Sequence, residues 1–531
     1  MQGFFGSYGK GRDWDLACFA GDSFVTRSYE AGDFHVNQVT LPKFLNDKYF
    51  AQIDGCFLAT EGVLLEADSA ADAISRYRKG ETTFWDQWRG SFAGLLYDSQ
   101  KETLLLFNDQ IGSKMLFYAM VNGDLVFASD LRILAETIGA NHLNQSFAHA
   151  ILDKGYARDD STFVQGVFRL TAGDYIRMEK NHFQCLPYHR FDNTPYAYDE
   201  DAMIAKTNQL FRQAVERVIR KNESEGLQHF FPLSGGLDSR LCQCVAHQMS
   251  KRPITNFTFS QTGHYDHMVP SEITRAWGND WVFVPLDGGE YITHIDRTCA
   301  RTEWIVNYMT PIEIDFFART QQWDNVGVVL TGINGDNIFA TETDNAHEMD
   351  RIYHQGLNGY SLGSPLIMQY YTETYSPFCD VDVLDYVLHV PTRKRHNYRF
   401  YDQLVLHCYP ELAQWHHKHM SIGHRPITVT LFGRSFPLRE LPMRFVKTVL
   451  RRLHIYDGYR ITQESMNPYD WWAKQNPHIL EQLRAYYDAH RDLITKYPWF
   501  KLCEEKMRIG AVMEKGKVLT VQSALTNLHI S

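Results

Sequence analysis

Residues 229–249 read HFFPLSGGLDSRLCQCVAHQM, and this stretch decides the fold. The apolar run from Phe230 to Leu233 is typical of a short buried strand, and residues 239–249 are predicted to form a helix. Between them, two adjacent glycines let the backbone turn tightly and present bare N–H groups. A strand, a glycine loop and a helix N-terminus in this order indicate an anion-binding turn in an α/β domain.

The loop carries groups suited to phosphate and to magnesium. The hydroxyls of Ser234 and Ser239 are donors beside the positive end of the helix dipole. Asp238 is a candidate magnesium ligand, because Mg²⁺ prefers one or two carboxylates together with phosphate oxygens. The loop is not a Walker A motif, since the chain has no GxxxxGK[ST] sequence. The predicted nucleotide-binding residues are Leu233, Ser234, Gly235, Gly236, Asp238, Ser239, Phe259 and Gly332.

A second glycine and acid turn, LTGINGDN at 330–337, follows the predicted strand 326–330. In a parallel sheet both turns lie at the carboxyl edge, where ligands bind. Asp336 would then complete the metal site that begins with Asp238, and both are predicted to be catalytic. On its own, the second turn could also be an ordinary Asn-Gly-Asp connection.

The pattern of elements predicts two kinds of architecture. Residues 1–190 are rich in short β-type runs, and Asn122-Gly123 between apolar runs predicts a hairpin, so this half is expected to contain antiparallel sheets. The second half alternates strands and helices and is expected to contain a parallel sheet. Beyond about residue 410 the pattern is mostly helical. The predicted elements are the hairpin strands 116–120 and 125–128, the helices 131–138, 201–220 and 272–277, and the strands 254–259 and 281–285.

Length and charge set further bounds. A chain of 531 residues is too long for one core, so two domains are expected. The net charge of −10 argues against nucleic acid as a partner. The nine dispersed cysteines include no CxxC, which favours a reducing compartment, and we expect a cytoplasmic protein. The first residues contain no apolar signal core, and no apolar run is long enough to span a membrane.

At these motifs the chain resembles a known family. The SGGLDS loop is similar to the pyrophosphate loop of N-type ATP pyrophosphatases. Residues 1 to about 410 resemble the asparagine synthetase B group, which includes β-lactam synthetases and lasso-peptide cyclases. The supporting phrases are GSFA at 90–93, GS at 112–113, FASDL at 127–131 and YSPFCD at 375–380, the last similar to the family's PFLD segment.

The resemblance implies a fold, a domain division and an activity. Residues 1–195 would form an Ntn-hydrolase-like, glutaminase-type α+β domain. Residues 196–531 would form an ATP pyrophosphatase domain with a five-stranded type of parallel sheet and a helical extension from about residue 410. Such a protein adenylates a carboxylate with ATP and Mg²⁺, releases pyrophosphate, and lets an amine expel AMP. The family's late phosphate-binding lysine would correspond to Lys394 or Arg399, although a solvated basic loop is equally compatible with that segment.

The chain also departs from the family. The family's glutaminase uses a cysteine directly after the initiator methionine, whereas position 2 here is Gln2, which is no nucleophile. The glutamine-binding Asn-Gly-Glu aligns with residues 54–56, DGC, and the acceptor-binding glutamate of the second turn aligns with Ile333. We therefore expect glutamine hydrolysis to be lost, with ammonia, another molecule or the substrate itself supplying the amine.

The substrate and the partners stay open at this stage. A small-molecule, glycan or peptide carboxylate is expected, such as a uronic acid of a surface polysaccharide. The alternative is a non-catalytic nucleotide-binding scaffold of the same fold. The stretch RELPMRFVKTVLRRLH at 439–454 is a basic, amphipathic segment that could contact a membrane surface or could pack its apolar stripe on the domain. The oligomeric state is undetermined, and a homodimer is one possibility.

Overall fold

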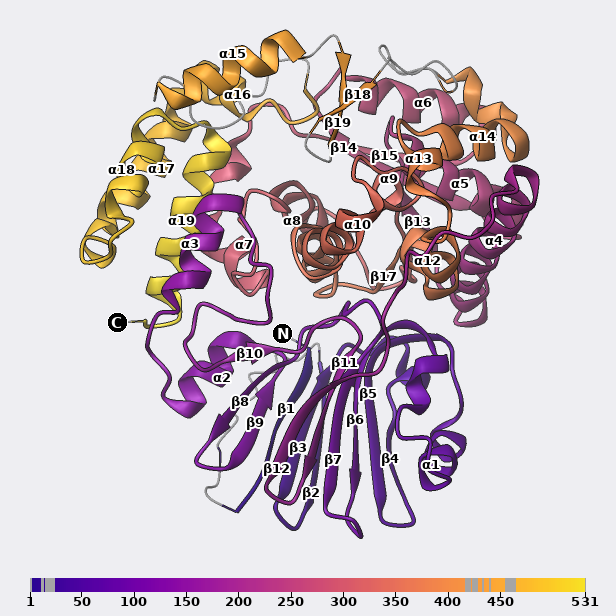
Figure 1. Cartoon of the computed structure of the whole chain (residues 1–531), viewed down its shortest axis with the longest axis vertical. Coiled ribbons are helices and arrows are strands. Elements are labelled where there is room, and N and C mark those ends of the chain that lie inside the picture. The colour runs from indigo at the N-terminus through magenta and orange to yellow at the C-terminus, as the bar shows by residue number, and fades with distance from the viewer. Residues whose placement is uncertain are drawn as a thin grey trace.

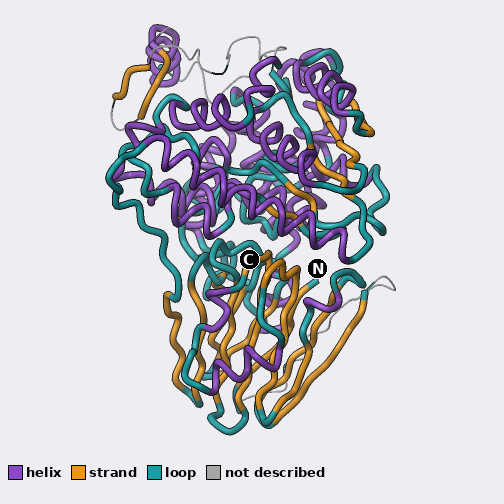
Figure 2. The backbone as a smooth tube through the Cα atoms, turned by 90° about the vertical axis from the view of Figure 1, so that its right-hand side faces the viewer, coloured by secondary structure: helices purple, strands orange, loops and turns teal. Residues whose placement is uncertain are grey.

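The computed structural model describes residues 2–10, 14, 24–415, 422, 428–431, 434–438, 441–453 and 465–530. A sheet-rich N-terminal half lies below a larger, mostly helical half in Figure 1. The view turned by 90° shows the same two layers (Figure 2). The fold is therefore α/β in the sense expected, with antiparallel sheets first and a parallel sheet later.

Two six-stranded antiparallel sheets form the N-terminal half. Apolar side chains such as Phe4, Phe34 and Leu106 fill the space between them. The first sheet has the order β10-β8-β9-β1-β3-β2 and the second β12-β11-β7-β6-β5-β4. The strands are β1 Gly3–Tyr8, β2 Val25–Ala31, β3 Phe34–Thr40, β4 Phe50–Ile53, β5 Cys56–Glu66, β6 Arg89–Asp98, β7 Thr103–Asn108, β8 Phe117–Val121, β9 Asp124–Ala128, β10 Phe168–Arg169, β11 Asp174–Glu179 and β12 His182–Pro187.

The predicted hairpin of this half is confirmed. β8 and β9 pair antiparallel around Asn122 and Gly123, whose φ angles of 53° and 94° suit a tight turn. The helix α2 (Leu131–Ile138) has the predicted bounds, because Asp130 caps its start and Gly139 ends it in the left-handed region.

Helices cover the outer faces of both sheets. α1 (Ala70–Arg78) packs Ile74 and Tyr77 against the second sheet. α2 and α3 (Gln145–Lys154) share a core with Phe117 of the first sheet. The resulting order of layers is helix, sheet, sheet, helix.

A parallel sheet forms the centre of the second half. β13 (His229–Pro232), β14 (Ile254–Ser260) and β15 (Asp280–Pro285) pair in parallel. β16 (Val329–Leu330) pairs in parallel with β17 (Thr374–Tyr375), and a parallel bridge between Gln228 and Val326 links the two groups. The five strands thus follow the order β15-β14-β13-β16-β17, although β16 is shorter than the predicted strand 326–330.

Helices pack around this sheet. α4 is longer than the predicted 201–220, because Asp199 caps it at the start and the helix continues to Ser224. The helices of this part are α4 Glu200–Ser224, α5 Leu237–Met249, α6 Tyr265–Trp277, α7 Ile295–Arg301, α8 Ile312–Arg319, α9 Gly335–Ile338, α10 Asn345–Arg351, α11 Gly363–Met368, α12 Val381–Val387, α13 Thr392–Arg395 and α14 Arg399–Cys408.

The C-terminal part is helical, as expected, but it also contains a hairpin and contacts both halves. α19 runs beside α3 and α7 (Figure 1). Lys517 donates to the carbonyl of Asp153 at 2.8 Å, and the indole of Trp304 donates to Ser523 at 3.0 Å. The elements are β18 Thr428–Leu431, β19 Arg434–Pro437, α15 Leu441–Arg452, α16 Tyr469–Gln475, α17 Pro477–Ala489, α18 Phe500–Ile509 and α19 Val512–Asn527.

Buried polar contacts join the two halves. Lys114 Nζ lies 2.7 Å from both carboxylate oxygens of Glu373, and both side chains are buried. Gln2 donates from its side-chain amide to the carbonyl of Gln369 at 2.5 Å. Within the described residues, no helix has the length and apolar character needed to cross a membrane.

Candidate active site

The glycine loop between β13 and α5 is held by its own serines. The backbone N–H of Ser234 donates to Ser239 Oγ at 3.0 Å, and the two hydroxyl oxygens lie 2.8 Å apart. The N–H of Gly236 donates to Ser234 Oγ at 3.2 Å. Both hydroxyls therefore fix the shape of the loop, in addition to any bond with a ligand.

Gly235 turns away from the cavity that the loop borders. Its N–H donates to Asp266 Oδ1 at 2.7 Å, and Asp266 is buried in the first turn of α6. A Cβ at this position would lie 2.3 Å from the ring of Tyr265. Gly235 is therefore needed for close packing against α6, and its N–H is already bonded.

The second turn lies directly against the first. A Cβ on Gly332 would lie 2.7 Å from the backbone nitrogen of Ser239, and one on Gly335 would lie 2.5 Å from Asp238 Cγ. Only residues without a side chain allow so close an approach. The glycines of the second turn thus bring Asp336 to the loop that contains Asp238.

The backbone of Asp336 contacts the carboxylate of Asp238. The backbone N–H of Asp336 donates to Asp238 Oδ2 at 3.1 Å, and the hydroxyl of Tyr401 donates to Asp238 Oδ1 at 2.9 Å. Burial and the nearby charge of Asp336 raise the pKa of Asp238. Burial also raises the pKa of Asp336, and the positive charge of Arg351 opposes this rise only in part. Both groups would be easier to ionise once a cation binds between them.

A cavity of about 320 Å³ opens beside the two turns. Its wall is mostly apolar away from the loop, which suits a flat organic ring better than water. Seven of the eight predicted nucleotide-binding residues line it, all except Gly235. The lining residues are Pro232, Leu233, Ser234, Gly236, Asp238, Ser239, Phe257, Thr258, Phe259, Ile314, Val329, Thr331, Gly332, Ile333, Ser364, Pro365, Met368, Thr374 and Met466.

The two predicted basic residues lie elsewhere. Lys394 Nζ sits 4.2 Å from the ring centroid of Tyr198, and Arg399 is an exposed residue at the first position of α14. Neither lines the cavity, and among the described residues no lysine or arginine lines it. The structure therefore does not bring these two residues together with Asp238 and Asp336.

Residues outside the predicted set complete the site. Tyr401 and Asp266 hold the loop, as described above. Arg351 on α10 donates to Asn337 Oδ1 at 2.5 Å, and its charge offsets part of the rise in the pKa of Asp336. No spacing rule connects these residues to the loop, because they come from distant helices. The sequence therefore offers no signal that could have identified them.

A second, smaller cavity of about 50 Å³ continues toward the N-terminal half. Thr331, Ile333, Pro365 and Thr374 line both cavities, so Ile333 lies where the two adjoin. The far wall comes from the N-terminal half and includes Ser91 and Ser113, whose hydroxyl oxygens lie 2.7 Å apart. Uncharged side chains and backbone line this second space.

The prediction that residues 54–56 form the glutamine-binding segment is wrong. Asp54 and Gly55 form an exposed hairpin turn between β4 and β5, with φ angles of 47° and 80°. Gln2 precedes β1, in which Phe4 pairs with Gln38, and the side chain of Gln38 donates to the carbonyl of Thr60 at 2.7 Å. Thr60 follows Asp54 by six residues along the extended strand β5. The hairpin turn therefore lies at the opposite end of β5 from Gln2.

The donor set at the two turns fits magnesium with phosphate. Carboxylate oxygens are the protein ligands that Mg²⁺ prefers; Asp238 lines the cavity, and Asp336 on the adjoining turn is in contact with it through its backbone N–H. Within the described ranges, no cluster of three or more His, Cys, Asp or Glu side chains forms a complete protein cage for a metal. A cation here would take its other ligands from the nucleotide and from water.

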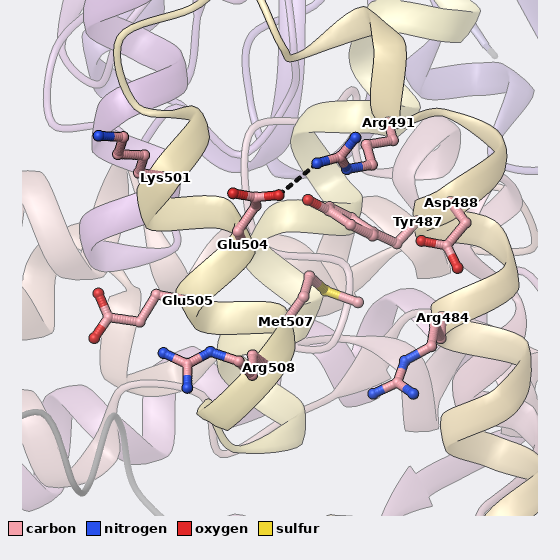
Figure 3. Close-up of a pocket in the computed structure, with 9 residues that line it drawn as sticks. All are labelled: Arg484, Tyr487, Asp488, Arg491, Lys501, Glu504, Glu505, Met507 and Arg508. Atoms are coloured by element: carbon pink, nitrogen blue, oxygen red, sulfur yellow. Dashed lines mark hydrogen bonds and ion pairs between the residues drawn. The ribbon is translucent and has the colours of Figure 1, made fainter.

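A larger hollow of about 740 Å³ lies between α17 and α18, away from this site. Figure 3 shows charged side chains of both signs around it, with Glu504 and Arg491 paired across the space at 2.5 Å. Both side chains of the pair are 43% exposed. An open hollow of mixed charge has none of the anion-binding features of the glycine loop.

Comparison with known proteins identifies two regions. Residues 58–189 match the family model described as a glutamine amidotransferase domain, and residues 206–365 match the one described as asparagine synthase. Asparagine synthetase [glutamine-hydrolyzing] 1 of Bacillus subtilis is 21% identical over 285 residues, which cover 53% of this chain and 44% of that protein. Amidase chyE of Penicillium rubens is 24% identical over 194 residues, which cover 34% of this chain and 27% of that protein.

More distant similarity extends these matches. A putative asparagine synthetase [glutamine-hydrolyzing] 2 of Methanocaldococcus jannaschii is 22% identical over 311 residues, covering 56% of this chain and 57% of that protein. The chain thus spans about half of the length of these synthetase relatives. A solved glutamine phosphoribosylpyrophosphate amidotransferase from B. subtilis matches 41% of this chain and 51% of its own at 12% identity, with a TM-score of 0.22.

Proposed function

The chain belongs to the asparagine synthetase family, and on this premise we propose that it is an ATP-dependent ligase that forms an amide by adenylating a carboxylate. One observation carries the proposal. Asp238 and Asp336 come from two separate strand-to-helix turns that are in contact, and Asp238 lines the cavity beside the glycine loop. Such a pair is useful for holding a metal and a polyphosphate together.

The cavity would take the nucleotide with its phosphates at the loop. Ser234 and Ser239 border the cavity and would lie beside the phosphates, while Phe259 and Met368 offer an apolar wall to the base. Asp238 and Asp336 would hold Mg²⁺ against the phosphate oxygens. When bound, that ion supplies positive charge that stabilises the negative charge developing on the leaving pyrophosphate.

The reaction would proceed in two steps. A carboxylate oxygen of the substrate attacks the α-phosphorus of ATP, and the bond to pyrophosphate breaks. An amine nitrogen then attacks the carbonyl carbon of the acyl-adenylate, loses a proton, and the bond to AMP breaks. A carboxylate alone is a poor electrophile, so the first step supplies the leaving group that the second step needs.

We propose that the amine does not come from glutamine. Gln2 has an amide where a nucleophilic cysteine would be required, and its side chain is buried and bonded to Gln369. An amide nitrogen has no lone pair available for attack, so this position supports no acyl-enzyme. Free ammonia or an amine of the substrate would serve instead.

The acceptor is proposed to differ from aspartate. Ile333, an apolar residue, lies where the nucleotide cavity meets the smaller one. Among the residues that the structure describes, no charged side chain lines this smaller space to pair with the amino group of an amino acid. A carboxylate on a glycan, a peptide or another small molecule fits this uncharged space better.

One observation favours a second candidate function. Among the described residues, the nucleotide cavity has no lysine or arginine in its wall, so no side-chain cation faces the leaving pyrophosphate. A scaffold or sensor that binds Mg·ATP without hydrolysing it needs no cation in the cavity wall to stabilise the leaving pyrophosphate. The ligase is preferred because both carboxylates and the glycine contacts around them are present together.

Product analysis separates the two functions. The protein is incubated with Mg·ATP and a panel of uronic acids, peptides and host extract, with ammonium, glutamine or neither. The ligase predicts AMP and pyrophosphate in equal amounts, no more with glutamine than with neither nitrogen source, and no glutamate released from glutamine; a gain with ammonium would identify ammonia as the amine. Asp238→Asn should abolish the products, while Asp280→Asn, at the exposed opposite end of the same sheet, should not. Binding without turnover across the panel would favour the scaffold.

A further inference from the structure

The helix α15 presents an unusual amount of apolar surface. Phe445 is 71% exposed, Leu453 60% and Met443 59%. Six large apolar side chains that are exposed fall within one short stretch, namely Leu438, Met443, Phe445, Val446, Val449 and Leu453. Elsewhere in the described chain such residues occur singly or on separate elements, which is normal for a folded protein.

This exposure rules out the alternative that the segment packs its apolar stripe on its own domain. An apolar stripe through Leu441, Phe445, Val449 and Leu453 would ordinarily pack on the domain. In the structure the last three of these are exposed. No described helix or strand packs extensively along α15, which lies at the outer edge of the molecule, far from the N-terminal sheets (Figure 1).

The charge of the segment opposes that of the chain. The sequence of α15 contains four basic residues, Arg444, Lys447, Arg451 and Arg452, and no acidic one, although the whole protein has a net charge of −10. At the helical period of 3.6 residues, the apolar positions 445, 446, 449 and 453 share one side. Basic positions 444, 447 and 451 fall on the other side, and position 452 falls at the border, next to position 445.

From this pattern we infer that α15 binds to the surface of an anionic phospholipid bilayer. A helix with an exposed apolar face and a cationic polar face lies in the interface plane, with its apolar side chains among the acyl chains and its cations near the lipid phosphates. An acidic protein surface would satisfy the charges but would leave Phe445 and Leu453 in water. Residues 439, 440 and 454 of the segment lie outside the described part of the chain.

Attachment through α15 would hold the catalytic cavity near the membrane. Met466 lines that cavity and follows Leu453 by thirteen residues. A connection of this length spans at most about 45 Å when fully extended. A carboxylate carried by a lipid-linked molecule would then be within range of the site.

The test is flotation of the full chain with vesicles. We expect the protein to bind phosphatidylcholine vesicles containing about one quarter phosphatidylglycerol roughly tenfold or more tightly than vesicles of phosphatidylcholine alone. High salt should weaken the binding, because it screens the charges. No binding, or equal binding to both kinds of vesicle, would overturn the proposal.

Matched variants test the apolar face. The double change Phe445→Asp and Leu453→Asp should abolish flotation without altering the circular dichroism, because both side chains are exposed. Leu480→Asp on α17, where Leu480 is 38% exposed, should float like the wild type. Sedimentation equilibrium without lipid tests whether a second copy of the chain covers the apolar face. A wild-type dimer that the double variant dissociates would overturn the proposal, since a second copy would then cover the face.

Discussion

The backbone N–H of Asp336 donates to Oδ2 of Asp238 at 3.1 Å, although 98 residues separate the two in the chain. The contact exists because Gly332 and Gly335 let the second turn approach the first. The second turn therefore positions the carboxylate of the first. A metal held between them would be lost if either the contact or a carboxylate were changed.

The first prediction concerns pH and the ligand-free protein. Burial and the nearby charge of Asp336 raise the pKa of Asp238 in the folded protein to about 7, above the unfolded value of about 4, so stability is lost as the pH rises through this range. We expect Asp238→Asn to raise the melting temperature by a few degrees at about pH 8 and by much less at about pH 5. Thermal unfolding at the two pH values measures this. A larger gain at the lower pH would contradict the assigned shift.

A second prediction tests the close approach of the turns. Gly335→Ala places a methyl group 2.5 Å from Asp238 Cγ, so the turns must move apart. We expect Mg·ATP affinity to fall at least about tenfold, since one good contact of ~1.4 kcal/mol corresponds to that factor. Gly356→Ala is the control, because its Cβ would meet nothing closer than 3.9 Å. Calorimetric titration that showed equal losses for both variants would refute the role given to Gly335.

A third prediction concerns Tyr401, which acts through Asp238. Tyr401→Phe keeps the buried ring but removes the hydrogen bond to Asp238 Oδ1. The ionised carboxylate then loses a donor, so its pKa rises further and Mg·ATP binding weakens by about fivefold to tenfold. The pH at which binding is half lost should also move upward. A purely structural role would lower the stability and leave this pH unchanged.

A fourth prediction concerns the contact between the two halves. Lys114→Met leaves the carboxylate of Glu373 buried without its partner, so the free energy of unfolding should fall by about 3–5 kcal/mol. Adding Glu373→Gln removes the stranded charge and should recover part of the loss. Denaturant unfolding of the wild type, the single variant and the double variant measures both effects. A double variant as unstable as Lys114→Met alone would show that the stranded charge is not the cause.

Local sequence was sufficient to predict the glycine loop and the second turn that contacts it. Asp238 and Asp336 each follow a strand, and parallel strands bring their carboxyl ends to one edge. This geometry is independent of the long connections between them. The hairpin at Asn122-Gly123 was predictable for a similar reason, because two residues determine the turn.

Long-range packing was not predictable in this way. Tyr401 reaches Asp238 from a helix 163 residues away, and nothing in its neighbourhood marks it. Lys394 and Arg399 were chosen by loose alignment, and Lys394 instead stacks on Tyr198. The exposure of Phe445 also depends on tertiary structure, because an amphipathic pattern is the same whether a domain or a membrane covers it.

Equilibrium binding of Mg·ATP to the wild type, Asp238→Asn, Asp336→Asn and Asp280→Asn tests the central claim most directly. It requires no knowledge of the acceptor. The account predicts magnesium-dependent binding to the wild type and to Asp280→Asn, a loss of at least about tenfold in both site variants, and weaker wild-type binding as the pH falls from about 8 to 6. Equal affinity in all four proteins, or no binding by the wild type, would contradict the claim that these two turns form a nucleotide site.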